Sequence, residues 1–288
     1  MSWAILLASL SEPARADEFA VVVDTSASMQ ANDPGQVAIL ATLLLSDLLV
    51  EGEDELWVVP FDRAMSGAGH NGSGPVLRRS DYANNAAFVQ ALQGALVYDG
   101  RSTYFAPPLA LALGNMGATG DRRVVLLLTD GGSNDEAGDE ARFRDEILPM
   151  ASKLGAQVWV VTLGQSGAAS TKLVRYFRTH RQGDYAHAST AEALPGVFAE
   201  VLGRATGRRV ETRRLKAGEA YRFDGLAPLA RVDVAGIATG AVTTSHLRVL
   251  LNLHFHIVHL DGVFDRGGDD ALHFFPRAPS TGDIEGLV

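Results

Sequence analysis

A buried-type strand that ends in a row of small oxygen-bearing side chains constrains the fold of this chain more than any other feature. The apolar run 19–23 is followed at once by Asp24, and hydroxyl side chains come at every second position after it, at Ser26 and Ser28. Hard divalent cations such as Mg²⁺ bind small oxygen ligands in octahedral geometry. Because hydroxyls carry no charge, the ion stays attractive to a further oxygen from outside. The pattern therefore indicates the first loop of a metal site.

Two later segments carry side chains of the same kind. Thr103 precedes an apolar helical run, and a second buried-type strand at 123–128 leads through Thr129 to Asp130. Each segment alone also has a simpler interpretation, since Asp, Thr and Ser cap helices through their side-chain oxygens, and Thr-Asp-Gly-Gly forms turns. A cation site is the interpretation that accounts for all three segments together.

Taken in this order, the three segments resemble the metal-ion-dependent adhesion site of the von Willebrand factor A (vWA) domain family. The Asp-x-Ser-x-Ser motif of that family falls on Asp24, Ser26 and Ser28, its single Thr on Thr103, and its last Asp on Asp130. The resemblance implies a Mg²⁺ or Mn²⁺ ion that the two serines and Thr103 contact directly. It also implies that the two aspartates hold the ion through water.

The stretch from residue 17 to residue 206 predicts a doubly wound, mostly parallel α/β sheet with helices on both faces. Short β-branched runs alternate there with longer helical ones, which is typical of such a sheet. Ligands bind beyond the carboxyl ends of its strands, which is where Asp24 and Asp130 fall. The expected strands are 19–23, 56–61, 123–128, 157–163 and an edge strand at 184–187. The expected helices are 35–50, 83–92, 105–116, 135–154, 170–179 and 191–204.

Length, charge and cysteine content exclude some classes of function. The chain has 288 residues, of which 47% are hydrophobic and 20% charged, and this fits one full globular domain with further material. The net charge of -9 argues against general binding to nucleic acid or anionic membranes, because those partners require basic faces. The absence of cysteine excludes disulfides and thiolate metal sites.

The segment 1–16 has features of an export signal. A short apolar run at 3–10 is followed by Pro13 and by Ala14-Arg15-Ala16, a small-x-small pattern of the kind that precedes cleavage. No Lys or Arg comes before the apolar run, so the segment is either a clipped signal or a lead-in to the first strand. No run approaches the roughly 18 apolar residues of a membrane span. We expect a periplasmic or secreted protein, with a cytoplasmic location as the alternative.

The pattern changes at residue 207. Alternating runs at 209–215, 220–223 and 230–234 are separated by turn residues, and they predict antiparallel strands. They are similar to the opening of the β-sandwich that follows vWA domains in some exported proteins. Three strands are too few to close a sandwich core. We therefore expect a truncated β-domain over 207–238.

The tail, residues 239–288, is rich in histidine. His254 and His256 lie two positions apart, so in a strand they face the same side and have the spacing to chelate one divalent metal. The stretch around this pair resembles an internal piece of HUH-type insertion-sequence transposases. Those enzymes need a tyrosine nucleophile further along, whereas the last tyrosine here is Tyr221. We interpret the tail as a weakly ordered, non-functional fragment; the simpler alternative is an edge strand with alternating histidines.

Three classes of function follow. The preferred one is a non-enzymatic binding module in which the cation accepts an Asp or Glu carboxylate from a protein partner, with no nucleic-acid partner. The second is a remnant DNA-nicking transposase that acts through His254 and His256. The third is a cytoplasmic adaptor of an ATPase chaperone system, which an export signal disfavours. No residue is predicted to be catalytic, because the serines have no neighbouring general base in the sequence.

Overall fold

The computed structural model describes most of the chain, in two compact units. The described ranges are 2–10, 17–49, 54–61, 76–100, 103–117, 122–133, 135–164, 182–216, 221–223, 231–239, 244–252, 256–257, 262–266 and 272–276. The larger unit is Ala14–Val201, and the smaller combines Met1–Pro13 with Leu202–Val288. The smaller unit is thus assembled from both ends of the sequence.

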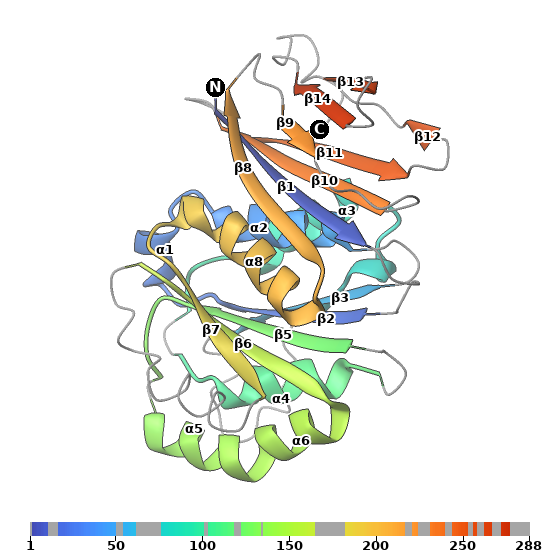
Figure 1. The fold of residues 1–288 in the computed structure, drawn as a ribbon. Helices are drawn as coiled ribbons and strands as arrows, with labels where there is room; N and C mark the ends of the chain where they lie inside the picture. Colours follow the sequence, from blue (N-terminus) through green and yellow to red (C-terminus); the bar gives the residue numbers. More distant parts are fainter. Residues whose placement is uncertain are drawn as a thin grey trace. The chain divides into compact units, whose positions relative to one another are not determined.

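The larger unit is built on a six-stranded sheet in the order β4-β3-β2-β5-β6-β7 (Figure 1). Its strands are β2 (Asp17–Asp24), β3 (Glu55–Phe61), β4 (Leu77–Arg78), β5 (Arg122–Thr129), β6 (Ala156–Leu163) and β7 (Gly183–Ala188). Neighbouring strands are parallel except for β3 and β4, which are antiparallel. The mostly parallel sheet expected from the sequence is confirmed. The edge strand β4 was missed, because two residues are too few to show a pattern.

The central strands are buried on both faces. In β2, Phe19 and Val21 point to one side and Ala20 and Val22 to the other, and all four are 0% exposed. Such strands read as continuous apolar runs instead of alternating ones. Helices α2 and α3 cover one face of the sheet and α4, α5 and α6 the other (Figure 1). On the second face one buried cluster includes Leu109 of α4 together with side chains of β2, β3, β5 and β6.

The helices agree with the expected ranges to within a few residues, apart from an additional short helix and an interruption of the expected helix 135–154. They are α1 (Met29–Asn32), α2 (Val37–Leu48), α3 (Asn85–Ala95), α4 (Ala106–Asn115), α5 (Glu136–Arg142), α6 (Leu148–Leu154) and α8 (Leu194–Thr206), with short 3-10 turns η2 (Arg79–Asp81) and η4 (Ala191–Ala193). The short α1 was not predicted, and the expected helix 170–179 lies outside the described residues. No helix in the described ranges is long and apolar enough to cross a bilayer.

The expected helix 135–154 is interrupted by a wider turn. A π-helical segment, η3 (Phe143–Ile147), lies between α5 and α6. Pro149, in α6, has no N–H to donate to the carbonyl four residues earlier, and its ring crowds that turn. A locally widened helix accommodates both effects.

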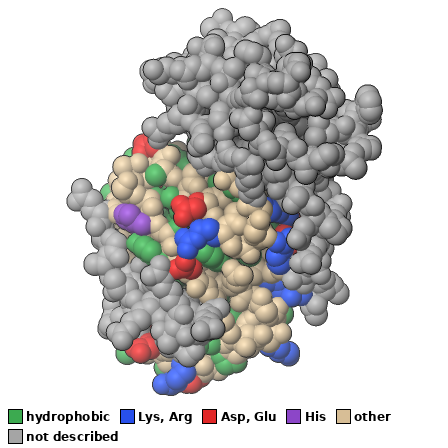
Figure 2. Space-filling model, viewed as in Figure 1, with side chains coloured by type: hydrophobic (Ala, Val, Ile, Leu, Met, Phe, Trp, Pro, Cys, Tyr) green, Lys and Arg blue, Asp and Glu red, His purple; other side chains and the backbone are tan. Residues whose placement is uncertain are grey.

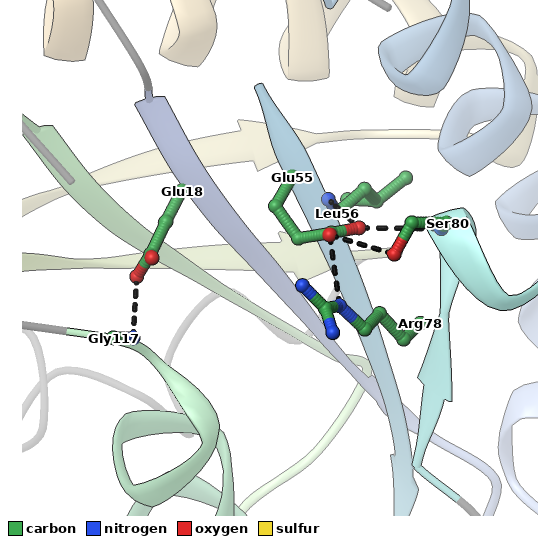
Figure 3. Close-up of polar contacts among 6 residues, drawn as sticks. All are labelled: Glu18, Glu55, Leu56, Arg78, Ser80 and Gly117. Carbon is green, nitrogen blue, oxygen red and sulfur yellow. Dashed lines mark hydrogen bonds and ion pairs between the residues drawn. The ribbon is translucent and has the colours of Figure 1, made fainter. Parts of the chain in front are cut away.

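Polar contacts hold the amino-terminal ends of β2 and β3 (Figure 3). Glu55 accepts hydrogen bonds from Nε of Arg78 and Oγ of Ser80, each at 2.8 Å, and so fastens β4 to β3. Glu18, on β2, accepts the N–H of Gly117 at 2.8 Å, just beyond the end of α4. These contacts lie at the opposite end of the strands from the predicted metal ligands.

The smaller unit consists of antiparallel strands in two sheets, with orders β12-β11-β10-β1-β8 and β13-β14-β9. The strands are β1 (Ser2–Leu10), β8 (Arg209–Lys216), β9 (Tyr221–Phe223), β10 (Arg231–Thr239), β11 (Thr244–Asn252), β12 (His256–Ile257), β13 (Gly262–Arg266) and β14 (Leu272–Pro276). Strands β8, β9 and β10 occur where antiparallel strands were expected.

Two features of this unit differ from the interpretation of the sequence. Strand β1 lies in the segment interpreted as an export signal, and it pairs with both β8 and β10. Strand β10 pairs with β11 of the tail, so the sheet continues across the boundary expected at residue 239. The export signal and the foreign origin of the tail stay predictions, and so does the other interpretation of 1–16, a lead-in to the first strand. Strand β1 itself was not predicted.

Candidate metal site

The first loop of the predicted site begins where β2 ends, and it is fixed on both sides. The N–H and the hydroxyl of Thr25 both donate to the carbonyl of Phe61 on β3, at 3.0 and 2.8 Å. On the other side, Ala27 donates its N–H to the carbonyl of Gly100 at 2.8 Å, and Ser26 forms a β-bridge with Gly100. The loop is thereby held at the carboxyl ends of the strands, where a doubly wound sheet binds its ligands.

Four of the five predicted ligands lie in one chain of hydrogen bonds. The N–H of Ser26 donates to Oδ1 of Asp24 at 2.9 Å. The hydroxyls of Ser26 and Ser28 are 3.0 Å apart, and the Ser28 hydroxyl donates to Oδ1 of Asp130 at 3.0 Å. Asp24, Ser26 and Asp130 are 0%, 5% and 6% exposed, whereas Ser28 is exposed. Two buried carboxylates therefore lie in one chain of hydrogen bonds with the exposed residue Ser28.

Thr103, the fifth predicted ligand, is buried and adjoins this group through its neighbours in the chain. Gly100, three residues earlier, forms the bridge to Ser26. The carbonyl of Thr103 lies 3.5 Å from the hydroxyl of Ser133, in the loop that follows Asp130. The structure thus places the Thr103 segment between the first and the third predicted loops.

Two further side chains contact the predicted ligands and were missed. Thr129 donates its hydroxyl to Oδ2 of Asp24 at 2.6 Å, and the amide of Asn32 donates to Oδ2 of Asp130 at 2.7 Å. Thr129 directly precedes Asp130, so the Thr-Asp pair was the signal available for it. Asn32 lies in the short helix α1, and no local pattern marks it.

The charge balance of the group favours a cation. Burial raises the pKa of Asp24 above its ordinary value; hydrogen bonds from Thr129 and Ser26 oppose this shift, and the charge of Asp130 adds to it. Among the ion pairs of the described residues, none involves Asp24. A divalent ion nearby would favour the ionised carboxylate and offset the cost of its burial.

The donor set fits a hard ion. Hydroxyl and carboxylate oxygens are the ligands that Mg²⁺ and Mn²⁺ take in proteins, together with retained waters. No group of three or more His, Cys, Asp or Glu side chains with ligand spacing occurs in the described part of the chain.

The histidine pair of the tail is described only in part. His256 lies on β12, paired with Asn252 of β11. His254 lies outside the described residues. A metal site at this pair stays a prediction.

With its six-stranded, mostly parallel sheet covered by helices on both faces, the larger unit has a vWA-like fold. Proximal thread matrix protein 1 from the mussel byssus, solved with a zinc-occupied MIDAS motif, is 17% identical with a TM-score of 0.50, over 73% of this chain and 50% of that one. The present chain therefore spans half the length of that protein. At this identity the comparison shows the fold alone.

Two further solved structures are similar. The von Willebrand factor type A protein from Catenulispora acidiphila is 16% identical with a TM-score of 0.46, over 85% of this chain and 67% of that one. The vWF domain of the type V pili tip protein Mfa5 from Porphyromonas gingivalis is 12% identical with a TM-score of 0.45, over 67% and 97%. No protein-family model matches the chain, and neither does any curated protein.

Proposed function

We propose that this chain is a divalent-cation-dependent protein-binding module, in which a Mg²⁺ or Mn²⁺ ion links the site to an Asp or Glu carboxylate of a partner. The observation that carries the proposal is the hydrogen-bonded group of Asp24, Ser26, Ser28 and Asp130 at the carboxyl ends of β2 and β5. It combines the buried carboxylates of Asp24 and Asp130 with serine hydroxyl oxygens, one of them on the exposed residue Ser28. Such a site leaves room for an outside ligand.

The uncharged and the charged residues of the site would have different roles. Ser26, Ser28 and Thr103 would hold the ion through neutral hydroxyl oxygens, and Asp24 and Asp130 would hold its waters. Because the direct ligands are neutral, the ion keeps most of its charge and attracts a further anionic oxygen. The exposed position of Ser28 favours approach of the partner from that side.

Binding fits the group better than catalysis does. A metal that activates water also needs a placed general base. The hydrogen bonds described for this group join Asp24, Ser26, Ser28 and Asp130 to one another and to Thr129 and Asn32. His187 bonds through Nδ1 to Thr162 at 2.9 Å, on the edge strand β7, which β5 and β6 separate from β2. We therefore propose a non-enzymatic role.

The charge distribution supports a protein partner over a nucleic acid. On the face shown in Figure 2, acidic and basic side chains of the described residues lie next to one another. With a net charge of -9, the chain has no overall attraction for a polyanion.

Calorimetric titration with Mg²⁺ tests the metal site. We expect the full chain to bind, and Asp24→Ala and Ser26→Ala to abolish the binding heat while the circular dichroism spectrum is kept, because residues at the rim contribute little to the core. Ser80→Ala is the matched control, since it removes a hydroxyl at the opposite end of the sheet. Unchanged Mg²⁺ affinity in both site variants would contradict the assignment of the metal site.

Capture of carboxylate peptides tests the partner chemistry. A pool of peptides with exposed Asp and Glu is passed over the immobilised chain in Mg²⁺, then in EDTA, then in Mg²⁺ again. We expect capture, loss and recovery, and no capture of the same peptides with Asn and Gln in place of Asp and Glu. Capture that persists in EDTA would place the contact elsewhere on the surface.

The proposed location is outside the cytoplasm. Two of the three similar proteins named above come from a byssus and a pilus, and the segment 1–16 has the features of an export signal. The alternatives are a cytoplasmic adaptor of an ATPase chaperone system and a remnant HUH transposase. Nicking of single-stranded DNA that disappears in His254→Ala would favour the transposase.

A further inference from the structure

A carboxylate outside the predicted ligand set joins two of the three loops of the candidate metal site. Asp139, in α5, is 4% exposed. Its Oδ2 accepts the N–H of Phe105 at 2.9 Å, and its Oδ1 accepts the N–H of Ala106 at 3.0 Å. The hydroxyl of Ser133 donates to the same Oδ2 at 2.5 Å. Three donors therefore engage both oxygens of one buried side chain.

The Asp139 carboxylate accepts the hydrogen bonds of the first N–H groups of helix α4. The first N–H groups of a helix have no partner inside it, and the N-cap Phe105 makes no side-chain capping bond. Pro107 and Pro108 follow Ala106 and have no N–H to donate. The donors left in this turn are the N–H groups of Phe105 and Ala106, and Asp139 accepts both. A carboxylate 33 residues further on thus replaces a local cap.

These bonds couple the two segments that carry Thr103 and Asp130. Thr103 stands two residues before Phe105, and Ser133 stands three residues after Asp130. Because Asp139 binds Phe105 and Ser133 through the same oxygen, it fixes one segment against the other. The first loop is joined to Asp130 by the separate bond from Ser28.

We infer that Asp139 is a positioning residue of the metal site, which together with Ser133 sets the place of Thr103 relative to Asp130 before the ion binds. The inference rests on the proposed function, since it assumes that the group holds a cation. Mg²⁺ demands near-ideal octahedral geometry at about 2.0–2.1 Å, so a small displacement of one ligand weakens binding. Groups that orient ligands typically change metal affinity about 10–100-fold when they are removed.

An ordinary helix cap and a positioning residue predict different results. A cap lost from α4 lowers the melting temperature by the same amount with and without the metal. A positioning residue that is lost also lowers the stabilisation that Mg²⁺ provides, because that stabilisation depends on the dissociation constant. The comparison therefore needs the melting temperature in Mg²⁺ and in EDTA.

The test compares Asp139→Asn and Ser133→Ala with a matched control, Glu18→Gln. Glu18 accepts the N–H of Gly117, just beyond the other end of α4. Since α4 has 10 residues, the two contacts are about 15 Å apart along the helix. Asp139→Asn and Glu18→Gln each neutralise a carboxylate that accepts a backbone N–H near one end of α4, whereas Ser133→Ala removes a hydroxyl that donates to Asp139. Glu18 also pairs with Arg123 at 3.7 Å, and it is the one of the three that lies away from the metal.

We expect Mg²⁺ to raise the melting temperature of the wild-type chain, and Glu18→Gln to keep this rise. Asp139→Asn should lose most of it, with a Mg²⁺ dissociation constant at least about 10-fold higher by calorimetry. Ser133→Ala should show a smaller change in the same direction, because Asp139 then keeps its two backbone donors.

A full Mg²⁺ rise in Asp139→Asn would overturn the inference. If that variant fails to fold, Ser133→Ala decides, and unchanged Mg²⁺ affinity there overturns the inference equally. A wild-type chain that does not respond to Mg²⁺ removes the proposed function as well. A responding wild type with an unaffected Asp139 variant removes only the positioning role.

Discussion

At the residue scale, Asp130 is held by a side chain that lies far from it in the sequence. The amide nitrogen of Asn32 donates to Oδ2 of Asp130 at 2.7 Å. On its other side, the Oδ1 of Asn32 faces Gly164, where an added Cβ would lie 2.7 Å from that oxygen. Gly164 has a φ of 84°, in the left-handed region that glycine adopts without strain. The orientation of Asn32 therefore depends on this glycine.

We predict that Asn32→Ala weakens Mg²⁺ binding by about 10-fold, because the Asp130 carboxylate loses a donor that orients it. The free energy of unfolding in EDTA should fall by about 1 kcal/mol, the usual net worth of such a bond. Gly164→Ala should weaken Mg²⁺ binding in the same way, since its methyl group would displace Asn32. Gln30→Ala, at an exposed position of the same helix, serves as the control. Wild-type affinity in Asn32→Ala, measured by calorimetry, would contradict the prediction.

A second prediction at this scale concerns pH. Asp33 is 0% exposed and accepts the N–H groups of Val37 and Ala38 and the hydroxyl of Tyr98. Burial raises the pKa of Asp33 above its ordinary value of 3.8, although these hydrogen bonds oppose the shift. A raised folded-state pKa means that the stability linked to this group is fully present below the unfolded pKa. It is lost as the pH rises through the folded pKa.

Asp33→Asn imitates the protonated form and does not titrate. The difference in free energy of unfolding between wild type and variant should therefore move in favour of the variant as the pH rises from below 3.8 towards neutrality. Urea unfolding at a series of pH values measures this difference. A difference that stays constant, or moves in favour of the wild type, would show that the pKa of Asp33 is not raised.

At the element scale, Gly183 begins the edge strand β7 and lies close against β6. Gly183 pairs with Val158, and a Cβ added at Gly183 would lie 1.6 Å from the Val158 carbonyl oxygen. That oxygen belongs to the backbone of a buried strand, so it has no room to retreat. The close pairing of these two strands therefore requires a glycine.

We predict that Gly183→Ala lowers the free energy of unfolding by about 2 kcal/mol or more, since overpacking against backbone forces the strands apart. Gly94→Ala is the matched control, because it lies in α3 with nothing within 4 Å of the added Cβ. There the same methyl group should stabilise the helix by about 0.5–1 kcal/mol. Denaturant unfolding of both variants checks the opposite signs, and equal effects would refute the argument.

At the scale of the whole molecule, β1 and an export signal exclude each other. Strand β1 lies between β8 and β10, and cleavage after Ala16 would remove it. We expect the larger unit to fold after this cleavage, since Asp17 is the first residue of β2. The N–H of Asp17 donates to Oδ1 of Asp54 at 2.9 Å, so a new α-ammonium there would lie beside a carboxylate.

We predict that the exported chain begins at Asp17 and keeps its response to Mg²⁺, because all predicted ligands follow that residue. Amino-terminal sequencing of protein recovered from outside the cytoplasm gives the start. A chain that retains Ser2 would show instead that β1 is a permanent strand of the smaller unit.

The sequence by itself determined the five parallel strands of the sheet and where they end. The apolar runs that became β2 and β5 are local features, and so are the Asp residues that end or follow them. The carboxyl ends of parallel strands meet at one edge of the sheet, so the sequence also predicted that Asp24 and Asp130 lie at the same edge. The motif around Asp24 lies within a few residues of sequence, so a local pattern was enough to predict it.

Only the tertiary structure decided which other residues form hydrogen bonds that fix the loops at this edge of the sheet. Asn32 contacts Asp130 across 98 positions, and Asp139 contacts Ala106 across 33. Neither contact leaves a periodic or local pattern, because the partners meet only after the helices have packed on the sheet. The same reason applies to β4, whose two residues are a strand only because β3 lies beside them.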